Sequence, residues 1–394
     1  MPEQDHTEDR TPHVHPDVLK LGLVSFLTDV SSEMIFSVFA VFLTVVAGAS
    51  AALLGIIEGL ADLSASSLNY LAGWLSDRTG KRKGFALAGY GFSTLAKVIL
   101  LVSSSIVSLG LFRVIERLGK SFRGPPRDAW LAAVAGQKNR GFSFGVHKAL
   151  DKSGAVLGPL IAYGLLSWLG EKAETFRLLF WAALVPAVLS VVVLALVREQ
   201  PGTPHPRESL FGTWATLSPG FKRYLVTAGI FSLAYFSFSF LLLRAYSVGF
   251  AIRDIVLLYA LFNIAAVIAA PLTGALGDRI GRTHMIQLGY GVYLLMCLGF
   301  AFAAAKWQVI VLFILFGVFY AIDEAQSRAF IADLEQERRA SAMGLYNLVT
   351  GLIYLPASLI AGALWLLHPA SAFLAAAGVA LLALLVLMRY RPGP

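Results

Sequence analysis

Four carboxylate residues stand inside long apolar runs near the start of the sequence. Asp29 and Glu33 are four residues apart in the first run, and Glu58 and Asp62 are four residues apart in the second. Residues at this spacing share one face of a helix. A charge at the centre of a bilayer costs on the order of 3 kcal/mol, so such residues usually mark a transport pathway. These four residues are therefore the first candidates for chemistry.

Two kinds of chemistry fit these carboxylates. Carboxyl groups in a dry environment can load and release protons. Alternatively, oxygen ligands suit a hard divalent cation, and Asp29 with Glu33 would then be the metal ligands, with Thr28, Ser31 and Ser32 as further oxygen donors. A purely structural role, in which each carboxylate pairs with a cation on a neighbouring helix, is the remaining interpretation.

Basic residues inside other apolar runs are the expected partners. Arg113 and Arg117 lie four apart in the fourth run, and arginine keeps its charge even when it is buried. We predict that Arg113 pairs with Asp29, so that protonating the carboxylate would free the arginine for an anionic substrate or a conformational change. Lys97, in the third run, is expected to neutralise a carboxylate.

The second half of the chain is poorer in charge and richer in aromatic residues. One group of these is Phe231, Tyr235, Phe236, Phe238 and Phe240. Most are expected to pack, and one or two to face a cavity. This uneven distribution predicts that ion coupling belongs to the first half and that a more apolar surface lies opposite.

The composition describes the elements that must position these residues. The 394 residues are 57% apolar and only 14% charged, whereas a soluble domain carries about 25% charged residues. The apolar runs are about 20 residues long, enough to cross a bilayer as helices. We therefore predict an all-α membrane protein with twelve transmembrane helices, at 18–47, 51–74, 84–104, 106–123, 145–169, 174–197, 223–248, 253–274, 284–304, 308–331, 342–367 and 370–388.

A proline-containing polar connector divides the twelve segments into two sets of six. The expected units are an N-terminal tail at 1–17, a first six-helix half at 18–198, a linker at 199–222 and a second half at 223–390. Lys and Arg gather in loops on one side, which predicts cytoplasmic termini. The net charge of +8 belongs to these loops, and nucleic acid is not expected as a partner.

The most specific motif is a basic turn between the second and third segments, and it has a partial copy 201 residues later. Glycines in such a turn allow a helix to end with φ > 0. The same turn in both sets indicates two parallel six-helix halves and alternating access. A plainer interpretation is that the basic residues only anchor the loop at anionic lipid. The residues are Gly73, Asp77, Arg78, Gly80 and Arg82 in the first turn, and Gly274, Asp278, Arg279, Gly281 and Arg282 in the second.

With these residues the chain resembles the Major Facilitator Superfamily, over essentially its whole length after about Pro16. The resemblance implies that the basic turns are gating motifs that latch the outward-facing state, and that the first helix lines the cavity, which ranks Asp29 first. The family's fourth-helix arginine looks like Arg113. Gly154, Gly158 and Pro159 match a fifth-helix pattern common in antiporters. The pattern implies export.

The sequence Arg-Gly-Pro-Pro-Arg-Asp-Ala at 123–129 resembles a loop that follows the fourth helix in a bacterial subgroup of this superfamily. This resemblance supplies no substrate.

The predicted function is proton-coupled export of a small molecule by a secondary transporter of the bacterial cytoplasmic membrane. The chain has no phosphate-binding loop and no His or Cys motif of an enzyme, so neither catalysis nor a cofactor is expected. The expected partners are a small molecule or ion, protons and the bilayer, and the expected state is a monomer. The alternatives are a divalent-metal exporter and a sensor or scaffold that does not transport. The residues expected in the cavity are Asp29, Glu33, Glu58, Asp62, Arg113 and Arg117.

Overall fold

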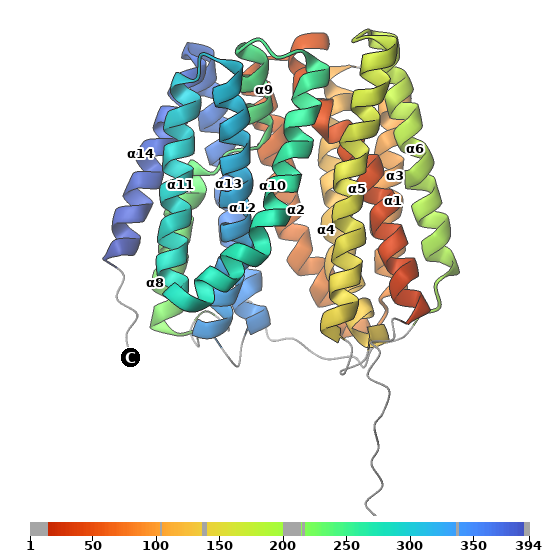
Figure 1. Ribbon diagram of the computed structural model, residues 1–394. Helices are drawn as coiled ribbons and strands as arrows, with labels where there is room; N and C mark the ends of the chain where they lie inside the picture. The colour runs from red at the N-terminus through yellow and green to blue at the C-terminus, as the bar shows by residue number, and fades with distance from the viewer. Residues whose placement is uncertain are drawn as a thin grey trace, which may run out of the picture.

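Long apolar helices make up nearly the whole molecule and run along one common direction (Figure 1). The computed structural model describes residues 15–102, 105–135, 140–199, 214, 217–335 and 339–389. Within these residues there are helices and no strands. The all-α fold with twelve membrane-length helical segments is therefore confirmed.

The first six segments follow one another with short connections. α1 (Pro16–Val41) continues directly into a π-helix, η1 (Phe42–Val46), and the two together form the first segment. The others are α2 (Ala51–Thr79), α3 (Lys83–Val102), α4 (Ile106–Ala135), α5 (Arg140–Leu169) and α6 (Ala173–Leu196).

The last six segments repeat this order. The seventh is built from α8 (Pro219–Ala234) and α9 (Ser239–Ser247), which are separated by non-helical residues at 235–238, where the sequence predicted one continuous helix. The others are α10 (Ile252–Ile280), α11 (Arg282–Phe302), α12 (Lys306–Leu334), α13 (Arg339–Leu367) and α14 (Pro369–Met388).

Ordinary capping signals set several helix starts. The Ser50 hydroxyl accepts from the backbone N–H of Leu53 at 3.2 Å, and the Ser218 hydroxyl accepts from that of Phe221 at 3.1 Å. Serine at the N-cap satisfies a donor that the first helical turn leaves free. Ten of the segments are long and apolar enough to span a membrane; α4 and α5 are as long but carry more charged residues.

The loop predicted after the fourth helix is not a loop. Residues 123–129 lie inside α4, which passes through Pro125 and Pro126 without a break. The φ angle of proline suits a helix, and its missing N–H is the cost. The packing of α4 along α2 and α3 offsets that cost. The charged residues of this stretch are therefore held on a rigid helix.

The helices pack as two groups, α1–α6 and α8–α14, that meet chiefly through α2 against α13 and α5 against α10. The contact between α2 and α13 is close because Gly59 has no side chain; one at that position would reach the backbone of Leu355. We call the end of the bundle where α1 begins and α14 ends the linker end; it is the lower end in Figure 1. The other is called the opposite end.

Candidate functional site

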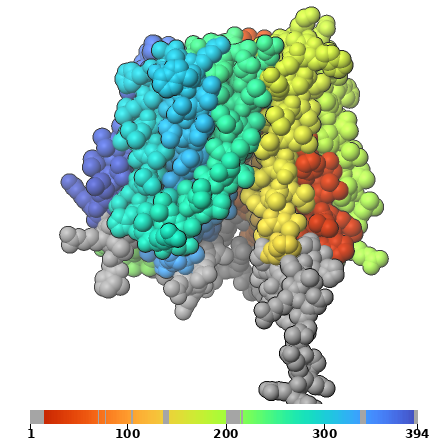
Figure 2. All heavy atoms as spheres, in the orientation of Figure 1, coloured from red at the N-terminus to blue at the C-terminus, as the bar shows by residue number. Residues whose placement is uncertain are grey.

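A cavity of about 510 Å³ lies between the two halves. We call it the central cavity. Among the residues that line it, Arg127, Lys148 and Arg328 lie in the parts of α4, α5 and α12 nearest the linker end. Figure 2 shows the surface hollowed between α5 and α10 toward that end. Its inner boundary includes Phe36 and Ser237.

The opposite end is closed by contacts between the halves. The Arg253 backbone N–H donates to Glu171 Oε1 at 2.9 Å, which joins the start of α10 to the α5–α6 connection. Deeper in, the rings of Phe36 and Tyr259 meet edge to face with centroids 5.5 Å apart. The structure is therefore in a state that opens toward the linker end.

The two sides of the central cavity differ in chemistry. The first half contributes nearly all the charged residues, which we call the charged wall. The second half contributes mainly aromatic residues, which we call the aromatic wall. The charged wall is Asp29, Glu33, Asp62, Arg113, Glu116, Arg117, Lys120, Arg123, Arg127, Lys148, Asp151 and Lys152, and the aromatic wall is Tyr235, Phe236, Phe238, Tyr259, Phe262, Phe316, Tyr320 and Tyr354.

A buried ion pair joins Glu58 of α2 to Arg113 of α4. Arg113 Nε donates to Glu58 Oε1 and Arg113 Nη2 donates to Glu58 Oε2, each at 2.9 Å. Both residues are buried, and the guanidinium lies 4.3 Å from the ring centroid of Phe36. This two-pronged geometry is the strong form of an arginine–carboxylate pair.

Glu58 also joins the two halves. The hydroxyls of Ser237 and Ser239 donate to its two oxygens at 3.1 and 3.0 Å. Ser237 lies in the break between α8 and α9 and Ser239 is the first residue of α9, so the interruption of the helix directs both at the first half. Each oxygen of Glu58 thus accepts from one half and from the other.

The predicted pair between Arg113 and Asp29 is wrong. Arg113 is bonded to Glu58 and lies 3.5 Å from Glu116 on its own helix. The reason is packing, since α4 lies along α2 for much of its length but only touches α1. Depth along the helix axis was the basis of the prediction, and depth does not say which helix faces which.

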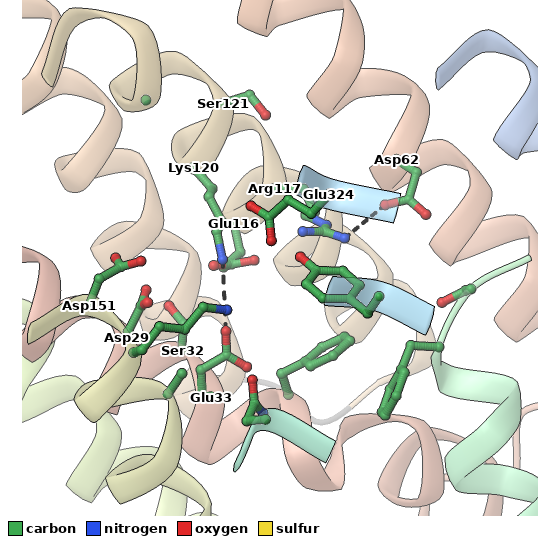
Figure 3. A pocket seen from close by; sticks show the side chains of 18 of the residues that line it. Asp29, Ser32, Glu33, Asp62, Glu116, Arg117, Lys120, Ser121, Asp151 and Glu324 are labelled. Carbon is green, nitrogen blue, oxygen red and sulfur yellow. Dashed lines mark hydrogen bonds and ion pairs between the residues drawn. The ribbon is translucent and has the colours of Figure 1, made fainter. Parts of the chain in front are cut away.

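The second predicted carboxylate on α2 has a similar but less buried partner. Arg117 Nη2 donates to Asp62 Oδ1 at 2.9 Å, and Figure 3 shows this pair at one side of the charged group. The Arg117 side chain is 30% exposed and the Asp62 side chain is 19% exposed. One turn of α4 thus separates a buried pair from one that water can reach.

Glu33 of α1 is a second link between the halves. Its Oε2 accepts a short hydrogen bond from the Tyr259 hydroxyl of α10. Its Oε1 lies 3.8 Å from Lys120 Nζ of α4. Figure 3 shows Lys120 reaching toward Glu33. Glu33 therefore holds one cation of the charged wall and one hydroxyl of the aromatic wall.

Asp29 differs from the other carboxylates of the central cavity. With the described residues it makes no hydrogen bond and no ion pair within 4.0 Å, whereas Glu33, Asp62, Glu116, Asp151 and Glu324 each lie that close to a cationic side chain. Asp29 is 8% exposed. Its surroundings are mixed in charge and include Asp151 and Lys120 (Figure 3).

Lys97 forms no direct ion pair in the described part of the chain, but Glu116 is the carboxylate whose charge acts on it most, so its neutralising role stays a prediction. Lys97 is fully buried in α3 and donates to the Ser32 hydroxyl at 3.2 Å and to the Ser93 carbonyl at 3.3 Å. The ammonium group is satisfied by neutral oxygens behind the charged wall. Within the described residues it has no carboxylate oxygen within 4.0 Å.

Two of the predicted oxygen ligands for a metal ion donate hydrogen bonds to backbone carbonyls, which leaves their oxygen lone pairs available. Thr28 donates to the carbonyl of Val24, and Ser31 donates to the carbonyl of Ala183. Among the described residues, no three His, Cys, Asp or Glu side chains gather closely enough to hold an ion. The side chains present do not favour the metal alternative over proton chemistry.

The fifth-helix glycines bring α5 against α1. A side chain on Gly154 would meet the Phe26 carbonyl, and one on Gly158 would meet the Val30 carbonyl. Close approach through small residues is typical of membrane helix pairs. This contact places Asp151 of α5 near Asp29, and it holds one side of the charged wall in place.

The two basic turns make their contacts within their own halves. Gly80 caps α2 with φ of 67° and Gly281 follows α10 with φ of 91°, as the turn motif predicts. In the second turn Arg282 lies 2.7 Å from Asp278. In the first, Arg78 lies over the Trp74 ring. The side chain of Asp77 falls outside the described residues.

The remaining motif residues add no contact between the halves in the described part of the chain. Arg279 is exposed, and Gly274 has open space where a side chain would be. Gly73 and Pro159 lie within α2 and α5. The Arg82 backbone N–H donates to Glu199 at 3.2 Å. A latch role for these turns stays a prediction.

Most of the aromatic wall was not predicted. Tyr235, Phe236 and Phe238 line the central cavity, whereas Phe231 stacks on Tyr290 in the core with centroids 3.8 Å apart. The larger part of the wall comes from α10, α12 and α13, whose aromatic residues are scattered among aliphatic ones in the sequence. The signal available was Asn263, four residues after Tyr259, because an amide in an apolar span indicates a polar face.

Comparison with known proteins identifies one family along nearly the whole chain. The sequence profile of the Major Facilitator Superfamily matches residues 21–252 and 225–394. An uncharacterized MFS-type transporter of Methanocaldococcus jannaschii is 34% identical over 393 residues, which is 98% of this chain and 97% of that protein. The multidrug resistance protein MdtG of Serratia proteamaculans is 27% identical over 67% of this chain and 65% of its own.

A solved structure agrees in fold. The crystal structure of the nucleoside transporter NupG (D323A mutant) superposes with a TM-score of 0.80 at 12% identity, covering 94% of this chain and 98% of its own. At this identity the likeness concerns the arrangement of the helices alone.

Proposed function

Because the chain belongs to the Major Facilitator Superfamily, we propose that it is a secondary active transporter whose transport is coupled to protons at Asp29. The profile and the relatives make it a multi-pass membrane transport protein, not an enzyme. Proton coupling and the role of Asp29 are the proposal. One observation carries them: Asp29 is a cavity-lining carboxylate with no hydrogen-bond or ion-pair partner among the described residues.

The lack of a partner among the described residues suits Asp29 to exchange protons. Protonating Glu58 would strip Arg113 of its buried partner, which is costly. Protonating Asp29 breaks no ion pair with the described residues. A charge without a partner among these residues also biases the conformational equilibrium when it is gained or lost, which is what coupling requires.

Alternating access would run through the contacts that close the opposite end. The bonds from Ser237 and Ser239 to Glu58, and from Tyr259 to Glu33, join the two halves in the present state. Opening toward the opposite end separates the halves there and must break them. Glu58 would then lose the two serine hydroxyls and stay bonded to Arg113.

Orientation and direction complete the proposal. Basic loops at the linker end support placing that end, with both termini, in the cytoplasm of a bacterial cell. Export is the direction predicted from the fifth-helix pattern, and MdtG carries the name of a multidrug resistance protein. Gly154 and Gly158 serve the packing of α5 on α1, a role that suits either direction.

The test is proton movement in proteoliposomes that contain the purified protein and a trapped pH-sensitive dye. A panel of organic anions, cations and neutral metabolites is added outside. A transported compound should change the internal pH, and Asp29→Asn should abolish this change while compound binding persists. Asp254→Asn, at a partly exposed carboxylate on α10 outside the cavity, is the control. Proton movement that survives Asp29→Asn contradicts the proposal.

A further inference from the structure

The charges that line the central cavity are unequally paired, although Glu58 and Asp128, just outside the lining, also pair with two of its cations, Arg113 and Arg127. The described lining includes eight Lys and Arg side chains and six Asp and Glu side chains. Most form ion pairs with one another. Two of the cations, Arg123 and Lys152, have no carboxylate oxygen within 4.0 Å among the described residues. Among the described lining carboxylates, Asp29 is the one that has no cationic nitrogen within 4.0 Å.

The two cations differ in how they are satisfied. Arg123 is 3% exposed, donates to the Ser93 hydroxyl at 2.7 Å and lies over the ring of Tyr90 at 4.5 Å. Lys152 is half-buried, and its ammonium lies 5.7 Å from the ring centroid of Tyr320. Lysine is a compact point charge on a flexible stem, suited to bind an anion that comes and goes.

The contact between Lys152 and Tyr320 places a cation beside the aromatic wall. Lys152 belongs to α5 in the first half, and Tyr320 belongs to α12 in the second. From Tyr320 the wall continues to Phe262 at 5.5 Å between ring centroids, and from there to Phe316 at 5.2 Å. Rings at such distances and tilts provide an apolar surface for another ring.

We propose that the central cavity binds a small aromatic anion, with its acidic group at Lys152 and its ring against Tyr320 and Phe262. This inference rests on the proposed function, because it assigns the chemical class of what the transporter carries. A volume of about 510 Å³ suits a ligand of one or two rings. An organic cation would instead meet Lys152, which has no carboxylate oxygen within 4.0 Å among the described residues.

An anion also fixes how the cargo and the proton move. Both Asp29 and the anion are negative in the same cavity, so a proton on Asp29 and a bound anion favour each other. They would travel together. Cotransport then replaces the export in exchange for protons that the fifth-helix pattern predicts.

The probe is 2-naphthalenesulfonate, which stays charged at every pH used. Its binding to the purified full chain in detergent is followed by its own fluorescence, with detergent alone as blank. The neutral 2-naphthalenesulfonamide and the cationic (2-naphthylmethyl)trimethylammonium are the comparison ligands. The anion should bind at least tenfold more tightly than either, since a charged contact in a partly buried site has about that value.

Variants then locate the site. Lys152→Gln should weaken anion binding roughly tenfold, Lys152→Arg should largely restore it, and Tyr320→Leu should weaken all three ligands severalfold. The control is Lys306→Gln, because Lys306 also lies over a ring, that of Phe250 at 5.4 Å, but outside the cavity. Tighter binding of the cation, or no effect of Lys152→Gln in a folded protein, overturns the inference.

These outcomes separate the inference from the proposed function. Anion binding without proton movement in the proteoliposomes keeps the substrate class and rejects coupling at Asp29. Proton-coupled transport of cations, without anion binding, rejects the substrate class and keeps the coupling.

Discussion

The two walls of the central cavity perform different tasks, although the two halves share one arrangement of six helical segments. The charged wall holds a carboxylate without a partner among the described residues, Asp29, beside fixed ion pairs. The aromatic wall offers rings and hydroxyls and little charge. In the proposed function the repeated fold would supply the movement, and the charged side chains of one half would supply the coupling. Substitutions in the two walls should change different quantities.

The largest expected effect comes from the buried pair that Arg113 of the charged wall forms with Glu58. Arg113→Ala leaves Glu58 buried without its main partner, which costs about 3–5 kcal/mol. We expect a large drop in thermal stability in detergent. Adding Glu58→Gln should recover part of it, because the unpaired charge is gone. Arg117→Ala, at the more exposed pair one turn away, should cost much less; equal losses for both arginines would contradict the distinction.

The next effect concerns the contact that positions Asp29. Gly158→Leu places a side chain where the β-carbon alone would lie 2.6 Å from the Val30 carbonyl oxygen. Overpacking of this kind costs about 1–3 kcal/mol and should separate α5 from α1. We expect the thermal stability in detergent to fall and proton movement in proteoliposomes to slow. Gly164→Leu is the matched control on the same helix, with open space around it. Equal effects at both positions would show that the close approach is unimportant.

A smaller effect is expected where the second half touches Glu58. The double variant Ser237→Ala/Ser239→Ala removes two hydrogen bonds that join the halves in this structure and that, in the proposed function, break when the opposite end opens. The population open toward the opposite end should rise roughly tenfold, since such bonds contribute about 1 kcal/mol or more. Spin labels at positions 172 and 306, both exposed at that end, would report the distance.

The control for that shift is Ser232→Ala, because Ser232 donates to the carbonyl of Ala228 within its own helix. The native Cys297 is buried and should not take a label. If the label distances are unchanged in the double variant, the serines do not hold the closed state.

The smallest expected effect belongs to the aromatic wall. Phe262→Leu keeps an apolar side chain of similar volume and should change stability by less than about 1.5 kcal/mol. The affinity for 2-naphthalenesulfonate should fall severalfold, and the number of protons moved per molecule transported should not change. A changed proton count would mean that the aromatic wall takes part in coupling, and the comparison between the walls would fail.

The sequence was sufficient for the helices and for the types of the site residues. Apolar runs of membrane length and the paired glycine turns follow from local pattern, and the structure has helices in those places. The charges were also recognisable, because Glu58 and Arg113 are costly inside an apolar span.

The partners of these charges could not be read from the sequence. Arg113 meets Glu58 because α4 packs along α2, and that packing depends on the whole bundle. The break at 235–238 contains neither proline nor glycine, so no local signal announces it. The aromatic wall is assembled from helices far apart in the chain. Long-range packing decided each of these features.

The most direct test of the account is the pH dependence of 2-naphthalenesulfonate binding in the wild-type protein and in Asp29→Asn. The groups around Asp29 are Glu33, Lys120, Arg123 and Asp151. If a proton on the charged wall and an anion on the aromatic wall favour each other, binding should be severalfold tighter at pH 6 than at pH 8. Asp29→Asn should bind equally at both. The same pH dependence in Asp29→Asn as in wild type would contradict the account.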